Sequence, residues 1–451
     1  MKVAKFGGSS LASATQIKKV ANIVNSDSKR RIVVVSAPGK RSKDDVKVTD
    51  LLIACAEHYL TFKEAKDELN LIFERFRLIT EELELEEETL EEITKDLEKR
   101  LYETDTSNRE RFLDVMKSAG EDNCAKVVAS YLKKTGVKAR YINPKEAGLI
   151  VSDEPGNARV LQESYEQLAK MRDSDEILVF PGFFGYSKTG EIVTFSRGGS
   201  DITGSIVAAA VKADLYENFT DVDSVYVANP NIVDSPKEIK ELTYREMREL
   251  SYAGFSVFHD EALIPAFRAG IPVCIKNTNN PLAKGTMIVA ERKENSENPV
   301  VGIASDKGFC SIYVSKYLMN REIGFGRRLL QILEEDGVSY EHLPSGIDDI
   351  SVIMRENQLT DEIEERVVGH IKQILKVDHI AVEHGLALIM VVGEGMNKTV
   401  GMAHRVTKAL ADASVNIEMI NQGSSEVSMM FGVKEEAVDR AVRAIYNEFF
   451  N

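Results

Sequence analysis

The sequence contains no apolar run approaching the roughly 20 residues that a membrane-spanning helix needs. The opening residues Met1–Lys5 lead into glycines before the apolar core of a secretion signal could form. Cysteines are few and far apart, and none of them forms a Cys-x-x-Cys pair. We therefore predict a cytoplasmic protein without a membrane span, a disulfide framework or a zinc site. The cysteines are Cys55, Cys124, Cys274 and Cys310.

Positive charge is also scarce. The chain has 57 Lys and Arg against 72 Asp and Glu, which gives a net charge of -15. Affinity for nucleic acids comes mainly from cations that neutralise phosphates, so this balance argues against a nucleic-acid-binding protein. An acidic enzyme that handles anions needs a local cationic site that reverses the overall field. The length of 451 residues predicts roughly two to four domains.

Two common nucleotide motifs are missing. The only Gly-Lys pair, Gly39-Lys40, is followed by Arg41, so there is no Walker A motif. The Gly393-Glu394-Gly395 stretch has Lys398 where a dinucleotide fingerprint needs its third glycine. The seven histidines form no cluster with the spacing of metal ligands, and we assign no metal ligand to the chain.

Alternating strands and helices mark the first part of the chain. Val3–Phe6 is a short apolar strand, and a helical apolar stripe follows it. Ile32–Val35 is an uninterrupted β-branched run, as in a buried parallel strand. The acidic segment 57–111 favours a helical hairpin with a solvated face over an interaction surface. We predict an α/β domain over residues 1–295, with ligands at the strand ends. Further elements are predicted as strands over 177–180, 192–195 and 271–276 and as a helix over 202–212.

An internal repeat follows a polar linker near residues 291–299. Nine pairs of identical residues are separated by a constant 77 positions without a gap. Such a period indicates two copies of one small α+β module. We predict the modules over residues 300–379 and 380–451. The pairs are Gly308/Gly385, Ile312/Ile389, Gly324/Gly401, Arg328/Arg405, Leu333/Leu410, Val338/Val415, Glu341/Glu418, Gly346/Gly423 and Ser351/Ser428.

The first candidate site motif is Lys5-Phe6-Gly7-Gly8-Ser9-Ser10. It places a cation at a strand end, two glycines in the turn, and serines that can cap the next helix. This arrangement suits phosphate oxygens. A plain capped turn explains the pattern equally well, so the residues alone leave both interpretations open.

The second candidate motif runs from Ser196 to Asp201. Arg197 can hold a carboxylate through two parallel hydrogen bonds. Asp201 stands at a predicted helix start, where its carboxylate can cap the helix, orient Lys5, or do both.

These motifs resemble those of monofunctional aspartate kinases across nearly the whole chain. The resemblance implies an amino-acid kinase fold, with a mostly parallel sheet between helices, followed by two ferredoxin-like ACT modules. It also implies ATP-dependent phosphorylation of the β-carboxylate of L-aspartate. The motifs are Lys5–Ser10, Arg197–Asp201, Phe219–Asp223, Lys276–Thr278 and, in the second module, Asn421–Glu426.

The resemblance also implies roles for single residues. Lys5 would stabilise the transferring phosphoryl group, with Asp201 as its catalytic partner. Glu121 would hold the α-ammonium of aspartate and Arg197 its α-carboxylate. The substrate-binding set is Thr49, Glu121, Arg197, Gly198 and Ser200, and the ATP-binding set is Lys5, Gly7, Gly8, Ser9, Thr220, Asp221, Tyr226, Asn231, Ser256 and Val257.

Two positions depart from the family pattern. Ser256 stands where members often have lysine, and Asp260 follows His259 where they often have proline. The chemistry itself needs no general base, because the β-carboxylate is ionised at neutral pH with a reference pKa of about 3.9. We expect catalysis by positioning of the substrates and by charge neutralisation, with Mg²⁺ coordinated mainly by the ATP phosphates.

The ACT modules imply feedback control and pairing into a homodimer or tetramer. Lysine is the expected effector, either alone or together with threonine, although the run Ser345–Asp349 departs from the Thr-Ser-Glu pattern of lysine-sensitive members. The open alternative is that the modules only dimerise the enzyme. The expected effector residues are Met319, Gly324, Phe325, Gly326, Ser339, Tyr340, Glu341 and Ser345.

Three other functions agree less well with the sequence. A related enzyme acting on glutamate, acetylglutamate or a nucleoside monophosphate would lack the tandem modules. A non-catalytic amino-acid sensor would not need Lys5. A fused homoserine dehydrogenase is not expected, because the sequence stops just after the second module.

Overall fold

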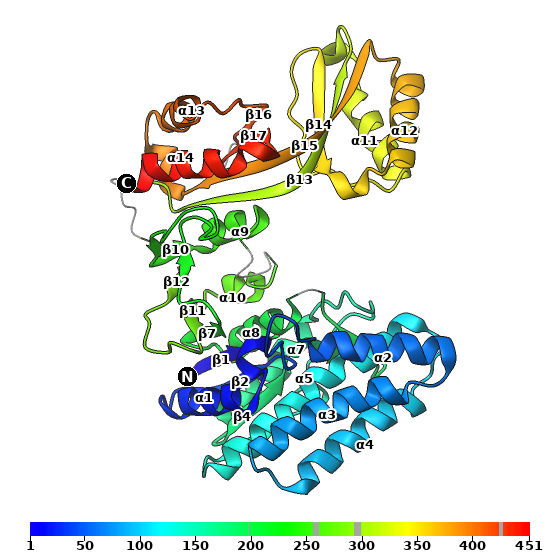
Figure 1. Cartoon of the computed structure of the whole chain (residues 1–451), viewed down its shortest axis with the longest axis vertical. Helices are drawn as coiled ribbons and strands as arrows, with labels where there is room; N and C mark the ends of the chain where they lie inside the picture. The colour runs from blue at the N-terminus through cyan, green and yellow to red at the C-terminus, as the bar shows by residue number, and fades with distance from the viewer. Residues whose placement is uncertain (197, 256–260, 293–298, 424–426) are drawn as a thin grey trace. The chain divides into compact units, whose positions relative to one another are not determined.

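The computed structural model describes residues 1–196, 198–255, 261–292, 299–423 and 427–451 (Figure 1). Contacts divide the chain into two compact units, which are described separately. The first comprises Met1–Val225, Glu238–Arg248 and Val257–Arg292, and the second comprises Tyr226–Lys237, Glu249–Ser256 and Lys293–Asn451. Within the described ranges, no helix is both long and apolar enough to cross a membrane.

An eight-stranded sheet forms the centre of the first unit, in the order β10-β12-β11-β7-β1-β2-β4-β3. The central strand β1 runs parallel to both β2 and β7, as the apolar, β-branched sequences predict. Strand β12 is antiparallel to β11 at one side. The strands are β1 (Lys2–Phe6), β2 (Arg30–Val35), β3 (Ala139–Tyr141), β4 (Ile177–Pro181), β7 (Leu215–Thr220), β10 (Glu241–Thr243), β11 (Val273–Asn277) and β12 (Thr286–Val289); short pairs elsewhere are β5 (Phe184–Tyr186) with β6 (Ile192–Thr194), and β8 (Val225–Tyr226) with β9 (Glu238–Ile239).

Side chains alternate across β1, and this alternation positions the later site. Ala4 and Phe6 join the apolar cluster that includes buried residues of α1 to α5. Lys5 therefore points to the opposite face, against which α8 packs. The longer helices are α1 (Ala14–Asn25), α2 (Val48–Phe62), α3 (Lys66–Glu82), α4 (Glu87–Glu103), α5 (Arg109–Lys134), α8 (Gly199–Ala210) and α9 (Tyr244–Tyr252), and the shorter ones are α6 (Pro144–Ala147), α7 (Gln162–Leu168) and α10 (Ile264–Arg268).

The acidic segment forms helices, as predicted. α3 and α4 bury one apolar stripe each, including Phe76 and Leu97, and turn most of their acidic residues toward solvent. The prediction of a solvated helical hairpin is therefore confirmed.

A five-stranded antiparallel sheet organises the second unit, in the order β14-β13-β15-β17-β16. The two sequence copies produce matching elements, each with one strongly amphipathic helix after its long strand. The elements are β13 (Gly302–Ser315), α11 (Phe325–Glu335), β14 (Asp349–Arg355) and α12 (Asp361–His370) in the first copy, and β15 (His379–Val392), α13 (Met402–Asp412), β16 (Met419–Asn421), β17 (Ser428–Lys434) and α14 (Val438–Phe450) in the second.

The two copies share their long strands. The first half of β13 (302–307) pairs with the second half of β15, which also pairs with β17 of the second copy. The second half of β13 pairs with the first half of β15 and with β14. The repeat-matched Gly308 and Gly385 have φ of +83° and +68° and lie where one half meets the other. Each copy's sheet is thus extended by half a strand from the other copy. The module boundaries given above stay a prediction.

Candidate active site

A cavity of about 530 Å³ opens where β1 and β2 end, beside α2, α5 and α8. The carboxyl ends of adjacent parallel strands meet at one edge of a sheet, so the loops that follow them can share one cavity. The structure brings together six residues predicted from the sequence. Lining the cavity are Lys5, Thr49, Glu121, Gly198, Ser200 and Asp201. Arg197 lies outside the described residues.

Lys5 is held in this cavity by an ion pair. Its Nζ lies 2.5 Å from Asp201 Oδ1, and the lysine is buried. Asn218, the neighbour of Lys5 on β7, donates from its side-chain amide to the same carboxylate oxygen at 2.5 Å. Asp201 lies in the first turn of α8, so that helix and two strands together fix the direction of the lysine ammonium. The sequence allows Asp201 to cap the helix, to orient Lys5, or to do both. The structure shows that Asp201 orients Lys5.

The glycine loop after β1 packs backbone to backbone against the loop after β2. The Gly39 amide donates to the Gly8 carbonyl at 2.9 Å, and a Cβ on Gly39 would lie 2.6 Å from the Gly8 carbonyl carbon. Arg75 of α3 donates to the Gly39 carbonyl and fixes this contact from outside. The Gly7 amide donates to the Phe219 carbonyl at 3.0 Å. Gly7, Gly8 and Ser9 are not among the described residues that line the cavity, and their contact with phosphate stays a prediction.

Glu121 carries a buried carboxylate that faces this cavity from α5. The residue is 5% exposed, and its Oε1 accepts a hydrogen bond from the Ser200 hydroxyl at 3.4 Å. Its Oε2 is buried and has no hydrogen-bond partner among the described residues. Burial raises the pKa of Glu121 to about 7, against the opposing effects of hydrogen bonds from the Ala37 amide and Ser200 and of the Lys5 charge. A buried carboxylate that forms no ion pair within the described residues is costly, so this group is suited to receive a cationic ligand.

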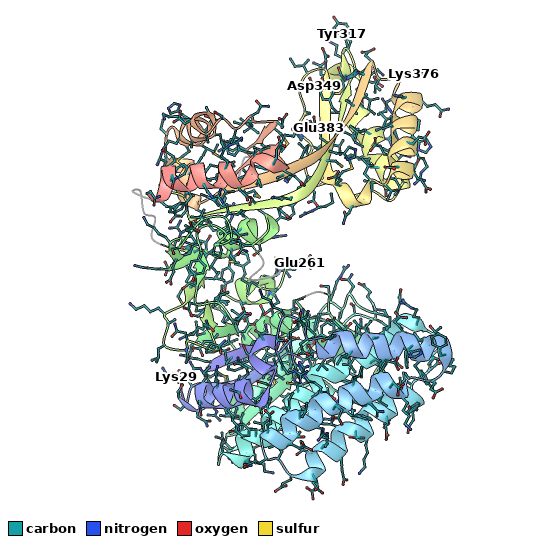
Figure 2. The ribbon with its side chains drawn as sticks, in the orientation of Figure 1. Lys29, Glu261, Tyr317, Asp349, Lys376 and Glu383 are labelled. Atoms are coloured by element: carbon teal, nitrogen blue, oxygen red, sulfur yellow. The ribbon has the colours of Figure 1, made fainter. Side chains whose placement is uncertain are left out.

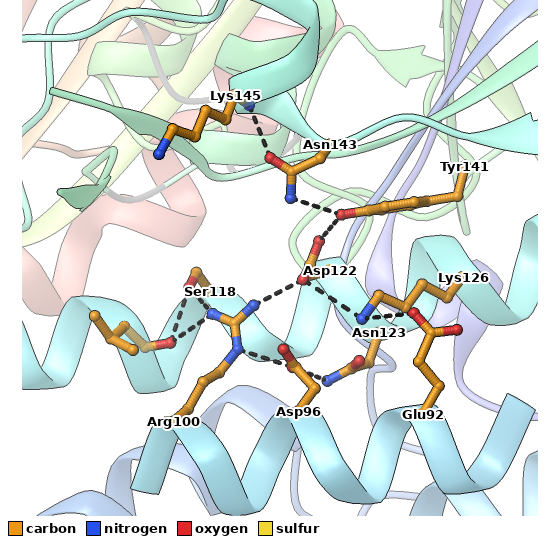
Figure 3. Close-up of polar contacts among 11 residues, drawn as sticks. Glu92, Asp96, Arg100, Ser118, Asp122, Asn123, Lys126, Tyr141, Asn143 and Lys145 are labelled. Carbon is orange, nitrogen blue, oxygen red and sulfur yellow. Dashed lines mark hydrogen bonds and ion pairs between the residues drawn. The ribbon is translucent and has the colours of Figure 1, made fainter. Parts of the chain in front are cut away.

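A buried polar network holds α5 against its neighbours (Figure 3). Arg100 of α4 donates to Asp122 at 2.7 Å and to Asp96 at 2.8 Å, and Tyr141 of β3 donates to Asp122 at 2.5 Å. Asp122 directly follows Glu121, so the network anchors the turn of α5 that carries the cavity carboxylate. Its remaining members include Ser118, Asn123, Lys126 and Asn143.

We expect Arg100→Met to destabilise the first unit by about 3 kcal/mol, because it removes the nearer cation of the buried Asp122 and leaves only Lys126, whose Nζ lies 3.9 Å away, among the described residues. Arg77→Met is a matched control on α3, since Arg77 is partly exposed and, within the described residues, forms its ion pairs with exposed Glu74 and Glu81. Loss of an exposed pair costs about 1 kcal/mol or less. Urea unfolding of both variants measures the difference, and equal midpoints would contradict the role of the network.

The predicted nucleotide-binding residues are only partly brought together. Thr220 is the last residue of β7 and Asp221 follows it, and the Thr220 carbonyl accepts from the Thr278 amide at 2.9 Å. Thr278 in turn shares a 2.7 Å hydrogen bond with Ser10 of the first glycine loop. Tyr226 and Asn231 belong to the second unit. Ser256 and Val257 lie outside the described residues, as does Asp260.

Sequence reasoning missed two lysines that line the cavity, Lys47 and Lys117. Lys117 Nζ lies 2.7 Å from Asp114 Oδ1, and the buried Asp114 also accepts from the Thr194 amide at 2.8 Å and the Gly156 amide at 2.9 Å. Lys117 lies one helical turn before Glu121 on α5, which is the one sequence signal that could have found it.

Comparison with known proteins decides the family. The amino acid kinase family matches residues 1–277, and an ACT domain family matches residues 389–449. Aspartokinase 3 of Bacillus subtilis is 63% identical over 450 residues, which cover 100% of this chain and 99% of that protein. The chain belongs to the aspartokinase family.

Solved aspartokinase structures agree with this assignment. The Clostridium acetobutylicum aspartate kinase is 40% identical with a TM-score of 0.88, and the match covers 100% of both chains. Escherichia coli aspartokinase III is 25% identical, with TM-scores of 0.80 for its complex with aspartate and ADP and 0.78 for its complex with lysine and aspartate, each match again covering 100% of both chains. The predictions of an amino-acid kinase fold, of C-terminal ACT modules and of aspartate kinase activity are therefore confirmed.

The second unit of this aspartokinase contains a cavity of about 500 Å³ on its sheet. Asp349, Glu383 and Glu418 line it, together with apolar residues such as Leu386. Asp349 and Glu383 are labelled in Figure 2, and Glu383 forms an ion pair with Lys434 at 2.5 Å. Ser345 is the one predicted effector residue that lines this cavity.

The other predicted effector residues lie around the loop after β13 and the segment before β14. Met319 begins a 3-10 turn, Gly324 precedes α11 with φ of +79°, and Phe325 is buried. Ser339 donates from its amide and its hydroxyl to Gln358. Gly326 lies in the first turn of α11, Tyr340 is exposed, and Glu341 accepts from the Tyr252 hydroxyl.

Proposed function

We propose that the cavity of the first unit holds aspartate beside the terminal phosphate of ATP. Glu121 binds the α-ammonium, Arg197 binds the α-carboxylate, and Thr49, Gly198 and Ser200 complete the substrate contacts. The observation that supports this most is the pairing of opposite groups in one cavity: a buried Glu121 oxygen without a partner, and a lysine aimed by Asp201.

The proposed reaction is an in-line transfer. A β-carboxylate oxygen of aspartate forms a bond to the terminal phosphorus while the bond from that phosphorus to the bridging oxygen of ADP breaks, giving 4-phospho-L-aspartate and ADP. Lys5 stabilises the negative charge on the phosphoryl oxygens during transfer. No side chain must remove a proton, because the nucleophile is already a carboxylate. Positioning of the two substrates and neutralisation of their negative charge therefore account for the acceleration of phosphoryl transfer.

Kinases that use ATP work with a divalent metal, and we propose Mg²⁺. In the described part of the chain no group of three or more His, Cys, Asp and Glu could hold a metal ion. Carboxylates such as those of Asp201 and Asp221 are the type of ligand that Mg²⁺ prefers, but Asp201 already forms an ion pair with Lys5. These residues fit an ion coordinated mainly by the nucleotide phosphates, whose charge it would reduce.

We propose feedback inhibition through the ACT modules by lysine, either alone or together with threonine. The E. coli relative solved with lysine supports this, and so does the acidic cavity in this chain. Glu383 is paired with Lys434, but Asp349 and Glu418 form no ion pair within the described residues, and beside an apolar wall they suit a flexible apolar side chain that ends in an ammonium.

We expect lysine to inhibit the wild-type enzyme and Asp349→Asn to need about tenfold more lysine, because the ammonium loses one charged partner worth about 1.4 kcal/mol. Glu365→Gln is the matched control, since Glu365 is exposed on α12. The measurement is activity and melting temperature against L-lysine, L-threonine and both, with D-lysine as a ligand control. A flat response would favour modules that serve only in dimerisation.

We also propose a homodimer or tetramer formed through the ACT modules, and a cytoplasmic location. Tyr317, Ile323 and Ile347 are 74%, 95% and 70% exposed, and an Asn320–Ile347 backbone hydrogen bond links their two loops. Exposed apolar side chains on neighbouring loops are typical of a protein-protein contact. The domain limits 1–295, 300–379 and 380–451 are part of the same proposal.

A further inference from the structure

Three lysine ammonium groups line the cavity of the first unit, and two of them are already paired. Lys5 lies 2.5 Å from Asp201, and Lys117 lies 2.7 Å from Asp114. Lys47 lines the same cavity but makes no ion pair within the described residues. It is therefore the cavity lysine whose charge is not balanced by a fixed carboxylate.

The backbone around Lys47 adds to its positive potential. Lys47 has extended φ and ψ of -69° and 148° and stands immediately before α2, whose 15 residues begin at Val48. No side chain caps this helix start, so its first amides contribute partial positive charge beside the lysine. Thr49, predicted to bind substrate, lies two residues further on and lines the cavity as well.

The acidic groups facing the cavity leave this position available to an anion. Asp201 is engaged by Lys5, and Glu121 is buried on α5 opposite Ser200. Asp50 lines the cavity on the first turn of α2 but forms no ion pair with Lys47. Because the whole protein carries a net charge of -15, an anionic substrate needs such a local cation to enter.

We propose that Lys47 is a further substrate-binding residue whose ammonium pairs with a carboxylate of bound aspartate. This inference rests on the proposed function of the cavity. Aspartate brings two carboxylates and one ammonium, and the proposed contacts assign Glu121 to the ammonium and Arg197 to the α-carboxylate. Lys5 is shared between Asp201 and the phosphoryl group. Lys47 gives the β-carboxylate, which Arg197 does not hold, a cation of its own, so that the substrate binds without competing for Lys5.

Lys43 provides a matched control. It lies in the same loop between β2 and α2, is exposed like Lys47, and is not among the cavity-lining residues. Lys43→Gln and Lys47→Gln therefore make the same change in net charge and differ in whether the lost charge faces the cavity.

The experiment is steady-state formation of aspartyl hydroxamate by full-length wild type, Lys47→Gln, Lys47→Arg and Lys43→Gln. We expect Lys47→Gln to raise the KM for aspartate about five- to tenfold, with kcat and the KM for ATP within about twofold of wild type. Lys47→Arg should recover most of the loss, and Lys43→Gln should match wild type. High salt should narrow the difference between wild type and Lys47→Gln, because exposed charges are screened.

A Lys47→Gln enzyme with an unchanged KM for aspartate would overturn the inference, and so would a rise confined to the KM for ATP. An equal effect of Lys43→Gln would show that only net charge matters, which also contradicts it. Melting temperatures near that of wild type exclude a folding defect at this exposed position. If wild type itself forms no hydroxamate from aspartate, the proposed function fails, and that result is distinct from all the others.

Discussion

Lys5→Ala should lose about 100- to 1000-fold in kcat while keeping its fold, because removal of one preorganised charge at a transition state costs about 3–4 kcal/mol. The KM for aspartate should change little, since Lys5 stabilises the phosphoryl group in the transition state and does not contact aspartate in the proposed site. The measurement is kcat by hydroxamate formation together with the melting temperature. Lys5 is buried beside Asp201, so some loss of stability will accompany the loss of rate.

Two controls separate catalysis from folding. Lys5→Arg keeps the charge beside Asp201 but moves it, so we expect a stable enzyme that is still slow. Lys29→Ala removes an exposed lysine near the start of β2 and should behave as wild type (Figure 2). A Lys5→Ala enzyme with near wild-type kcat would refute the assigned role.

Glu121→Gln should lower kcat/KM for aspartate about 100-fold, because the substrate ammonium loses a buried charged partner worth about 3 kcal/mol. The loss should appear mainly in the KM for aspartate. Glu110→Gln, an exposed position on the same helix α5, is the control and should leave kcat/KM unchanged. An unaltered KM in Glu121→Gln would remove this residue from the substrate site.

The pKa of Glu121 also predicts a pH dependence. Because burial raises this pKa from 4.5 to about 7, the carboxyl of the free enzyme is protonated below pH 7 and cannot pair with an ammonium. We therefore expect kcat/KM for aspartate to fall as the pH decreases through about 7. In Glu121→Gln this pH dependence should be absent.

The raised pKa of Glu121 has the opposite effect on the stability of the folded protein, which decreases as the pH rises. The folded state binds the Glu121 proton more tightly than the unfolded state, so stability falls as the pH rises from about 4.5 to 7 and then levels off. At pH 8 without substrate, Glu121→Gln should be more stable than wild type, by up to about 3 kcal/mol. A variant that is both less active and more stable is the signature of a functional buried charge.

The sequence was sufficient for the parts of the fold that local patterns control. Ile32–Val35 is apolar on every residue, which only a strand buried on both faces requires, and it forms part of β2 between β1 and β4. Gly8 of the first loop and Gly39 of the second meet backbone to backbone, and a Cβ on Gly39 would lie 2.6 Å from the Gly8 carbonyl carbon, so the glycine at position 39 answers a steric demand of this contact. The repeat of 77 positions likewise predicted two matching modules.

Long-range pairings could not be predicted in the same way. The exchange of half-strands between the copies depends on the β13–β15 register, which no single segment encodes. The contacts around Lys5 are an example within the site. The sequence motif predicts Asp201 as a partner of Lys5. Asn218 lies 17 residues beyond Asp201, and its side chain reaches the Asp201 carboxylate only because β7 pairs with β1. Lys47 and Lys117 were missed because a lysine near a helix start or on a helix face is ordinarily a solvated residue.

The central claim is that this cavity phosphorylates the β-carboxylate of aspartate. The most direct measurement incubates the enzyme with ATP, Mg²⁺ and hydroxylamine, together with L-aspartate, D-aspartate, L-asparagine or L-glutamate, and quantifies the hydroxamate. We predict ATP-dependent hydroxamate from L-aspartate, and none from the other three. No product from L-aspartate, or more product from L-glutamate than from L-aspartate, would contradict the account.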